Sequence, residues 1–254
     1  MKIAVLGAGA LGCAMGSCLS EAGHEVWLIN RRADHVAAMN THGLSVRIQG
    51  LDRHIPVKAA CNAQEIAAKT GCVDLIVVLV KSFDTREAIA SAASIVGPGT
   101  VVLSLQNGLG HEDVLAEVVG RDKVLAGKTY AGGVLIGAGH IIGGTQGKDT
   151  HIGELNGEVT PRVTRIAEVF NQNACQVPLE FLVSAVDQRI GRAGGGGAVG
   201  LQQYLRAGGA RRHRRQDPVG TGAPAAASVR PVARIHRPRR RLAGAGAALR
   251  PGAA

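Results

Sequence analysis

Residues 2–12 read KIAVLGAGALG and join an apolar run to a glycine-rich turn. Residues 2–6 are typical of a short buried strand, and the turn after them has the pattern Gly-x-Gly-x-x-Gly. Apolar residues at helical spacing continue to Gly23, and a second β-rich run follows at 25–29. Strand, turn, helix and strand within about thirty residues match the size of a βαβ unit.

The three glycines of this turn have separate physical roles. The first permits a tight turn, the second lets backbone N–H groups approach a pyrophosphate, and the third allows close packing of the helix, whose N-terminus faces the phosphates. The pattern alone is weak, because a glycine-rich turn can arise by coincidence. Here it follows a strand and opens a helix, so it predicts dinucleotide binding.

Further along the chain, strands and helices continue to alternate. An unbroken apolar run at 74–80 is typical of a parallel strand covered on both faces. We expect a helix over 84–94, a turn at Gly97-Pro98-Gly99, a strand over 100–105 and a helix over 111–119. This alternation predicts a doubly wound, mostly parallel α/β sheet of the Rossmann type.

From about residue 126 to residue 154 the pattern changes to short β-like runs separated by glycines, which predicts an antiparallel edge to the sheet. The runs are 128–136, 140–142 and 150–152. Thr160-Pro161 then supplies an N-cap and a first-turn proline for a helix ending near Asn171. Residues 177–187 are expected to lead into a second domain.

The end of the second strand indicates which nicotinamide cofactor the turn prefers. Sites specific for NAD usually have an acid there, which holds the ribose 2′-hydroxyl, whereas this chain has Asn30-Arg31-Arg32. Because an arginine can pair with a 2′-phosphate, we expect NADP(H), with Arg31 as the contact. The alternative is that both arginines are a solvated start to the next helix.

Two polar residues follow parallel strands at the edge where open α/β sheets bind ligands. They are Lys81 and Asn107. A single lysine at a strand end is more often a surface residue than a ligand. Two polar residues at two such ends make a cofactor or substrate contact an equally good interpretation.

Four motifs together resemble the ketopantoate reductase (2-dehydropantoate 2-reductase) family in order and spacing. They are GAGALG at 7–12, VKS at 80–82, QNGLG with its preceding leucine at 105–110, and THIG at 150–153. The resemblance covers roughly residues 1–185 and is most specific in the second and third motifs. It implies NADPH-dependent reduction of 2-dehydropantoate to (R)-pantoate, a step in pantothenate and coenzyme A biosynthesis.

The resemblance also implies roles for individual residues. Arg31 would hold the 2′-phosphate, Lys81 and Asn107 would contact the cofactor near its reacting end, and Asn107 would also lie close to the substrate. Gly133 falls where the family has a small residue whose backbone touches the cofactor. The pyrophosphate would be held by Gly7, Ala8, Gly9, Ala10, Leu11 and Gly12.

The chain departs from the family in its last quarter. The family's general acid is a lysine on the first long helix of a second domain, followed by asparagines at helical spacing. The last lysine here is Lys148, so no catalytic residue is identified. We therefore predict an NADP-binding domain over 1–178, and a remnant of the helical domain with a disordered basic tail over 179–254.

The net charge of +10 comes from that tail alone. Residues 1–188 hold 15 Lys and Arg against 18 Asp and Glu, whereas 189–254 hold 14 Arg and one acid. Of those last 66 residues, 47 are Ala, Arg, Gly or Pro, which is too few large apolar side chains for a core. One interpretation is a genuine tail that binds nucleic acid or another polyanion, making this a non-catalytic NADP(H)-binding protein.

The other interpretation of the tail is a frameshift. Ala, Arg, Gly and Pro are the residues whose codons can begin with two G/C bases, so their joint dominance suggests G/C-rich DNA read out of frame. Shifted by one base, the codons of 201–204 necessarily yield Asn or Ser at two successive positions. Such residues are compatible with the absent asparagine-bearing helix, and we favour this interpretation.

Composition limits the remaining possibilities. Aromatic residues make up only 2% of the 254, which argues against stacking platforms for bases. The five cysteines show no CxxC pair and read as reduced core thiols, so we expect a cytoplasmic protein. We expect a small keto acid as substrate, no metal and no membrane partner; nucleic acid would bind only if the tail is genuine, and a homodimer is an open alternative.

Overall fold

The fold is built on one large sheet. The computed structural model describes residues 1–144, 148–171 and 179–183, and within them eight strands lie in the order β12-β11-β8-β7-β6-β1-β2-β5. From β8 to β5 the neighbours are parallel, whereas β11 is antiparallel to β8 and parallel to β12. The strands are β1 (Lys2–Leu6), β2 (Glu25–Ile29), β5 (Lys58–Ala60), β6 (Val73–Val78), β7 (Val96–Ser104), β8 (Val124–Thr129), β11 (Lys148–Glu154) and β12 (Leu179–Val183). The predicted doubly wound α/β fold is confirmed.

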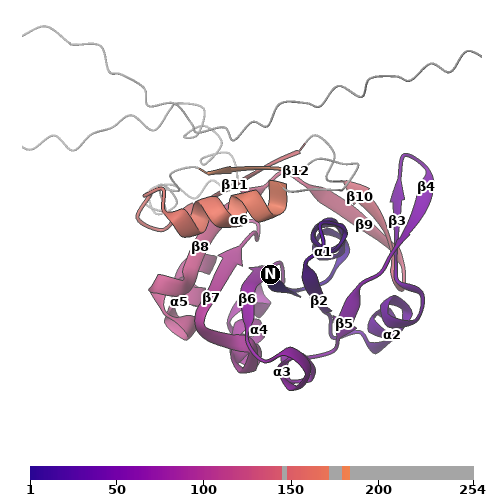
Figure 1. Ribbon diagram of the computed structural model, residues 1–254, viewed down its shortest axis with the longest axis horizontal. Helices are drawn as coiled ribbons and strands as arrows, with labels where there is room; N and C mark the ends of the chain where they lie inside the picture. Colours follow the sequence, from indigo (N-terminus) through magenta and orange to yellow (C-terminus); the bar gives the residue numbers. More distant parts are fainter. Residues whose placement is uncertain (145–147, 172–178, 184–254) are drawn as a thin grey trace, which may run out of the picture.

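Helices cover both faces of this sheet (Figure 1). Side chains of α1, α2 and α6 enter one hydrophobic core, and those of α3, α4 and α5 enter the core on the other face. The helices are α1 (Ala10–Glu21), α2 (Ala33–His42), α3 (Ala63–Thr70), α4 (Thr85–Ser91), α5 (His111–Val119) and α6 (Pro161–Asn171). Because both faces are covered, the β6 residues Leu75–Val78 are fully buried, as their unbroken apolar run predicts.

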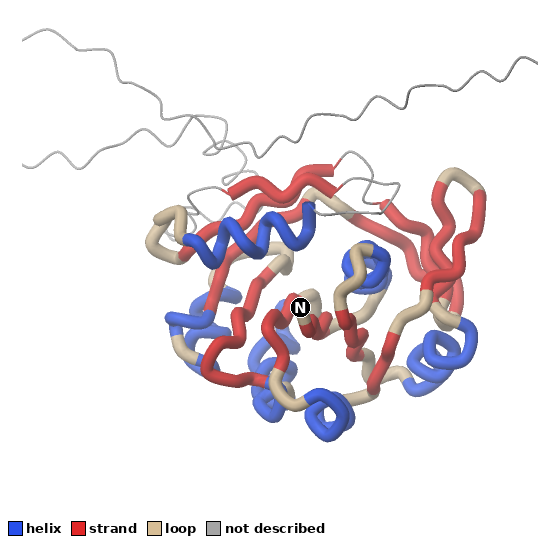
Figure 2. Tube along the Cα trace, in the orientation of Figure 1, coloured by secondary structure: helices blue, strands red, loops and turns tan. Residues whose placement is uncertain are grey.

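A second, four-stranded sheet lies beside α1, in the order β4-β3-β10-β9 (Figure 2). Its strands are β3 (Leu44–Ile48), β4 (Leu51–Ile55), β9 (Gly132–Gly137) and β10 (His140–Gly144). The sequence pattern placed 128–136 and 140–142 on the edge of the main sheet, which holds for 128–129 and is wrong for the rest. The chain leaves the main sheet after Thr129, and β9 and β10 pair with each other and with β3 instead. The third run, 150–152, does form the antiparallel edge, in β11.

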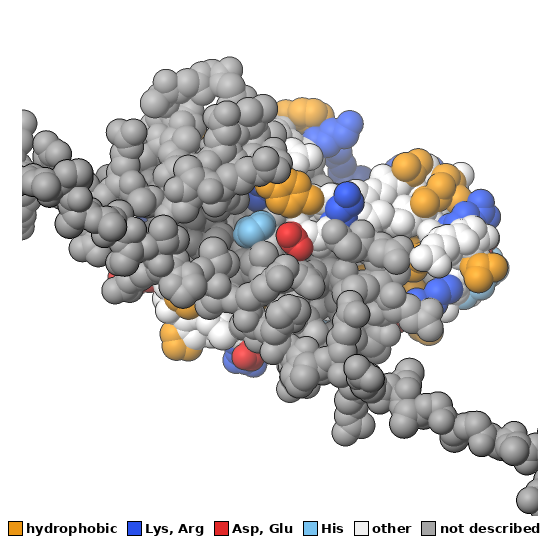
Figure 3. Space-filling model, turned by 90° about the horizontal axis from the view of Figure 1, so that it is seen from above, with side chains coloured by type: hydrophobic (Ala, Val, Ile, Leu, Met, Phe, Trp, Pro, Cys, Tyr) orange, Lys and Arg blue, Asp and Glu red, His pale blue; other side chains and the backbone are white. Residues whose placement is uncertain are grey.

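The second sheet carries half of the large hydrophobic side chains that the described residues expose. Seen from above, hydrophobic and basic side chains gather at the right of the molecule, the side that the second sheet occupies in Figure 1 (Figure 3). The exposed hydrophobic residues of this sheet are Leu51, Val134, Leu135, Ile136 and Ile142.

Two local expectations change in detail. The predicted turn Gly97-Pro98-Gly99 lies within β7, where the register jumps from Val73–Val96 to Leu75–Val101, so the segment bulges out of the pairing. Thr100 Oγ1 closes the bulge by accepting the Gly97 N–H (2.8 Å) and donating to Val73 O (2.6 Å). The helix expected over 84–94 is α4 flanked by two short 3₁₀ turns, Ser82–Asp84 and Ala93–Ile95.

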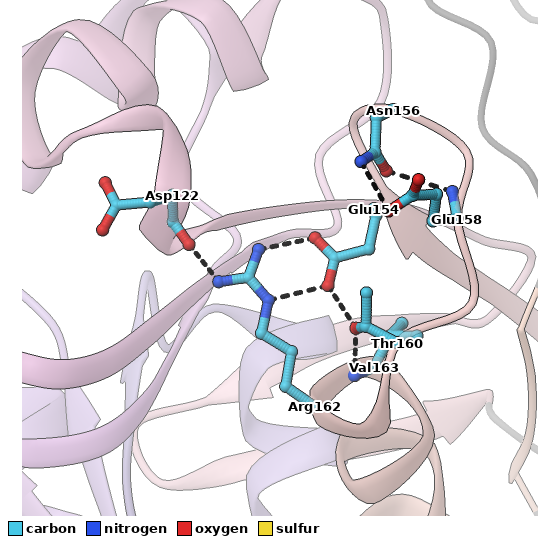
Figure 4. Close-up of polar contacts among 7 residues, drawn as sticks. All are labelled: Asp122, Glu154, Asn156, Glu158, Thr160, Arg162 and Val163. Atoms are coloured by element: carbon cyan, nitrogen blue, oxygen red, sulfur yellow. Dashed lines mark hydrogen bonds and ion pairs between the residues drawn. The ribbon is translucent and has the colours of Figure 1, made fainter.

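The start of α6 is held by a polar cluster that joins three elements (Figure 4). Thr160 caps the helix as predicted, because its Oγ1 accepts the Val163 N–H (3.3 Å) and donates to Glu154 Oε1 (2.5 Å). Arg162 donates to both Glu154 oxygens, from Nε at 2.7 Å and Nη2 at 2.5 Å, and also to the carbonyl of Asp122 in the short turn Arg121–Lys123. The cluster thus fastens α6 to β11 and to the start of β8.

The segment expected to lead into a second domain is described only over 179–183. There β12 pairs in parallel with β11, from Lys148–Leu179 to Ile152–Val183, so the sheet continues five residues past the boundary predicted at 178. Residues 184–254, on which the predicted helical remnant, basic tail and frameshift depend, lie outside the described residues.

The cysteines occupy different environments. Cys13 and Cys18 are buried and form no disulfide, as expected, whereas Cys61 is half-buried and Cys72 is exposed, which corrects the expectation that all are core residues. Cys175 lies outside the described residues. Among the helices of the described residues, none is both long and apolar enough to span a membrane. The same residues contain no group of three or more side chains suited to hold a metal ion.

Candidate functional site: the carboxyl edge of the main sheet

The predicted site residues converge where the strand order reverses. The chain winds one way from β1 through β2 to β5, and the other way from β6 through β7 to β8, so the switch point lies between β1 and β6. Ligands of open α/β sheets bind at the carboxyl ends of the strands at this point. The loops that follow β1, β2, β6 and β7 are 7–9, 30–32, 79–81 and 105–110. They carry six of the ten predicted contact residues, and three more, Ala10, Leu11 and Gly12, follow in the first turn of α1.

The glycine turn follows β1, and its geometry explains each glycine. Gly7 has φ +103°, and a Cβ there would lie 2.7 Å from the Leu79 carbonyl carbon. A Cβ at Gly12 would lie 2.3 Å from Gly7 O, so the third glycine is needed for packing. Gly9 differs from both, because a Cβ there would meet no atom within 4 Å. The open space beside Gly9 is where a pyrophosphate would approach the backbone.

The start of α1 is the only one among the described α-helices with neither an acid in its first turn nor a side-chain cap. The others have one or both: α2, α4 and α5 have acids, α3 has Glu65 and the Asn62 cap, and α6 has the Thr160 cap. The first helical hydrogen bond of α1 runs from the Cys13 N–H to Gly9 O (2.8 Å), so the N–H groups of 10–12 precede the helical ladder. A bound anion would accept hydrogen bonds from these N–H groups and balance the positive end of the helix dipole.

Asn30 supports the turn from the end of β2. Its Nδ2 donates to Ala8 O (2.7 Å), and its Oδ1 accepts the Arg32 N–H (2.9 Å). The residue that stands in place of the usual acid is therefore used to hold the turn and to orient the next residues. Sequence reasoning noted only that no carboxylate was present.

The two arginines after Asn30 point to different partners. Arg31 is 80% exposed, and its Nη2 lies 3.0 Å from Asp84 Oδ2, across the edge in the 3₁₀ turn Ser82–Asp84. Arg32 pairs with Asp34 on its own helix, at 2.5 Å. This arrangement favours Arg31 over Arg32 as the side chain that faces the ligand edge, and it shows that a carboxylate already pairs with the predicted phosphate contact.

Hydrogen bonds from Gln106 join the loops that carry Lys81 and Asn107. Gln106, which is buried, donates from Nε2 to Val80 O (2.9 Å) and to Thr85 Oγ1 (2.8 Å). Gln106 Oε1 is buried and has no partner. Because these bonds hold the two loops side by side, the exposed side chains of Lys81 and Asn107 project from one rigid edge.

His111, at the start of α5, supports the second loop. Its Nε2 lies 2.9 Å from Asn107 O and 3.4 Å from Ser82 Oγ. Gly108 has φ +108°, and a Cβ there would lie 3.1 Å from the same nitrogen, so the loop closes tightly over the ring. Sequence reasoning missed Gln106 and His111. The available signal was a polar residue close behind a buried strand for Gln106 and the first residue of the next helix for His111.

Gly133 reaches the site from the second sheet. A Cβ on Gly133 would lie 3.3 Å from the carbonyl carbon of Ala10 and 3.0 Å from Ile142 O. The first residue of α1 and the start of β9 are therefore in close contact. The structure thus brings Gly133 to the glycine turn although more than a hundred residues separate them in the chain.

Comparisons with known proteins agree with this geometry. A model of the family described as ketopantoate reductase PanE/ApbA matches residues 3–157. The chain is 40% identical over 172 residues to the 2-dehydropantoate 2-reductase of Pyrococcus abyssi. This match covers 67% of this chain and 53% of that protein.

Solved structures show the same likeness. The 2-dehydropantoate 2-reductase from Geobacter metallireducens superimposes with a TM-score of 0.63 at 30% identity, covering 71% of this chain and 57% of that one. D-mandelate dehydrogenase with NADH and anilino(oxo)acetate gives a TM-score of 0.64 at 27% identity, covering 71% and 56%. The chain spans about half the length of the curated relatives it matches.

Proposed function

This chain belongs to the ketopantoate reductase family, and from that premise we propose that residues 1–178 form the NADP(H)-binding domain of a 2-dehydropantoate 2-reductase. The reaction would reduce the keto group of 2-dehydropantoate to the hydroxyl of (R)-pantoate, toward pantothenate and coenzyme A. The observation that carries the proposal is the open space at Gly9 beside the uncapped start of α1. The site fits a pyrophosphate because backbone N–H groups, and no carboxylate of the helix, face that space.

Each predicted residue has a place in this proposal. The turn from Gly7 to Gly12 would hold the pyrophosphate. Arg31 would break its ion pair with Asp84 and bind the 2′-phosphate instead. Gly133 would line the cofactor through its backbone. Lys81 and Asn107 would lie near the nicotinamide, with Asn107 also near the small keto acid. When bound, the reduced cofactor supplies the hydride for the keto carbon.

The reduction also requires a proton for the keto oxygen, on which negative charge develops. In the family this proton comes from a lysine of the second domain, and no lysine follows Lys148 in this chain. We therefore propose that the chain as written binds NADPH and reduces ketopantoate little or not at all. A frameshift would explain the missing lysine, and a genuine polyanion-binding tail is the alternative.

The test combines cofactor binding and turnover on the full chain. Quenching or enhancement of NADPH fluorescence is expected to titrate to saturation, while NADPH oxidation with ketopantoate stays at background. Re-reading the coding DNA from about codon 180 is expected to open a frame with a lysine followed by asparagines at helical spacing. Normal turnover by the chain as written would contradict the proposal; closed alternative frames, with salt-sensitive DNA binding, would favour the polyanion-binding tail.

Changes at Arg31 and Asp84 test the proposed choice of cofactor. Arg31→Ala is expected to weaken NADPH binding about tenfold, because a charge-assisted contact to the 2′-phosphate is lost, with little effect on NADH. Asp84→Asn is expected to strengthen NADPH binding about two- to threefold, because it removes a competing carboxylate 3.0 Å from the guanidinium. Arg32→Ala, which removes a neighbouring exposed arginine, is the control. If Arg31→Ala lowered the affinities for NADPH and NADH equally, Arg31 would not contact the 2′-phosphate.

A further inference from the structure

Beneath the glycine turn lies a histidine that the proposed function does not use. His35, in the first turn of α2, is fully buried. Its Nδ1 lies 2.9 Å from the backbone nitrogen of Gly139, at the tip of the β9–β10 hairpin. Its Nε2 lies 3.2 Å from Ala8 O, inside the glycine turn. One imidazole therefore bridges two segments that lie 131 residues apart, from Ala8 to Gly139.

The partners determine which ring nitrogen carries the proton. A backbone N–H can only donate, so Nδ1 must accept from Gly139 and must be unprotonated. The proton is then on Nε2, where it donates to Ala8 O. The neutral Nε2–H form satisfies both bonds, whereas a protonated ring would lose the bond to Gly139.

The surroundings of His35 favour the neutral ring. Burial lowers its pKa, and Arg32 lowers it further, while the bond to Ala8 and the charge of Asp34 raise it. From α1, Cys13 Sγ lies 3.5 Å from Nε2; burial raises the pKa of this thiol to about 12, so it stays uncharged. The hairpin contributes the Gly139 amide to this contact.

Ala8 O is the point at which the ring acts on the site. It accepts three donors from the interior: Asn30 Nδ2 at 2.7 Å, His35 Nε2 at 3.2 Å and Cys13 Sγ at 3.4 Å. These bonds keep the carbonyl turned inward, away from the open space beside Gly9. A carbonyl that turned outward would place a negative dipole against a pyrophosphate and weaken binding.

The hairpin touches the same site twice. At its tip, Gly139 has φ +64° and sits on α2, where a Cβ would lie 3.1 Å from Ala38 Cβ. At its start, Gly133 packs against Ala10. The hairpin and the glycine turn are therefore joined at two places, through His35 and through Gly133.

We propose that His35 is a positioning residue of the nucleotide site, where a single neutral imidazole holds both the Ala8 carbonyl and the tip of the β9–β10 hairpin. The proposal rests on the proposed function only in taking a dinucleotide as the ligand of the turn. Through His35, the conformation of the glycine turn and the position of the β9–β10 hairpin depend on each other.

Two variants separate the two bonds of the ring. In His35→Gln the side-chain amide can reach the Nε2 position and donate to Ala8 O, but leaves Gly139 without an acceptor. In His35→Asn the side-chain oxygen can take the Nδ1 position and accept from Gly139, but leaves Ala8 O without this donor. Ala37→Ser, two residues away on the exposed side of α2, is the control.

The readouts are hydrogen exchange of the Gly139 amide and NADPH affinity, both on the full chain. In His35→Gln, hydrogen exchange at Gly139 is expected to become about tenfold faster or more, while NADPH affinity stays within about threefold of the parent value. In His35→Asn, exchange at Gly139 is expected to stay slow, while NADPH affinity falls about tenfold. In the parent chain, protection of the Gly139 amide is expected to be constant above pH 6.5 and to fall below it, because protonation of His35 removes the acceptor of that amide; in His35→Gln the protection is expected to be low at every pH. Nitrogen NMR of the parent ring is expected to show the proton on Nε2.

Several outcomes would overturn the proposal. A ring protonated on Nδ1, or variants that change exchange and affinity in parallel, would show that His35 is only a packing residue. A parent chain that binds no NADPH contradicts the proposed function instead. A chain that binds NADPH equally well with His35→Asn contradicts the positioning role alone.

Discussion

Gly9→Ala is expected to weaken NADPH binding by about tenfold or more while leaving the chain as stable as its parent. Gly9 has φ −78° and ψ −161°, which alanine adopts without strain, and its Cβ would meet no protein atom within 4 Å. The added methyl group would instead occupy the space into which the pyrophosphate must come. We expect a loss of at least about tenfold in affinity for alanine, or about 1.4 kcal/mol, and a larger loss for Gly9→Val.

Two other glycines make this prediction specific. Gly99→Ala, at an open position on the far side of the sheet, is expected to change neither stability nor binding. Gly12→Ala is expected to lower both, because its Cβ would lie 2.3 Å from Gly7 O. Fluorescence titration with NADPH and urea unfolding of the three variants measure these effects. Parent-like NADPH affinity in Gly9→Ala would show that the turn does not bind the dinucleotide.

Arg162→Met is expected to lower the free energy of unfolding by about 2 kcal/mol near pH 7. Glu154 is a buried carboxylate, and the change removes the guanidinium that bonds both of its oxygens (Figure 4). The expectation is kept below that for a fully buried pair because the Arg162 side chain is 35% exposed. Arg165→Ala, at an exposed position on the same helix, is expected to be neutral in the same urea unfolding experiment.

The same pair predicts a dependence on pH. Burial raises the pKa of Glu154, but the bonds from Arg162 and Thr160 outweigh it, so the folded-state pKa lies below the ordinary 4.5. The stabilisation is therefore fully present above pH 4.5 and lost as the pH falls through the folded-state pKa. The difference between the parent and Arg162→Met should shrink over this acid range. A difference that stayed constant with pH would show that packing of Arg162, and not its charge, stabilises α6.

Much of the main sheet could be predicted because its signals are local. The apolar run of β1, the glycine turn and the pattern of α1 lie next to one another in the chain, and each has a physical reason to form. For the same reason the N-cap Thr160 and the bounds of α5, His111–Val119, were predicted correctly. Positions at the ends of β6 and β7 could also be anticipated, since parallel strands end at one edge.

The second sheet could not be predicted in this way. Its strands are short, and β4 (Leu51–Ile55) is mostly exposed and lacks a clear alternation. The strand β10 pairs with β3, about a hundred residues earlier, through Ile141 and Val46. Pairing at that distance depends on how the intervening helices pack, which no window of sequence contains.

The residues of the candidate site also fall into two groups, those predictable from local sequence and those that depend on tertiary contacts. The sequence alone determined that Gly7, Gly9 and Gly12 form the turn from β1 into α1, because their spacing acts within a single turn of chain. Only the tertiary structure decided that Arg31 faces Asp84, that Gln106 and His111 hold the loops after β6 and β7, and that His35 bridges Ala8 and Gly139. Each of these contacts joins groups from different elements, and a hydrogen bond forms only where the completed packing brings donor and acceptor within about 3 Å.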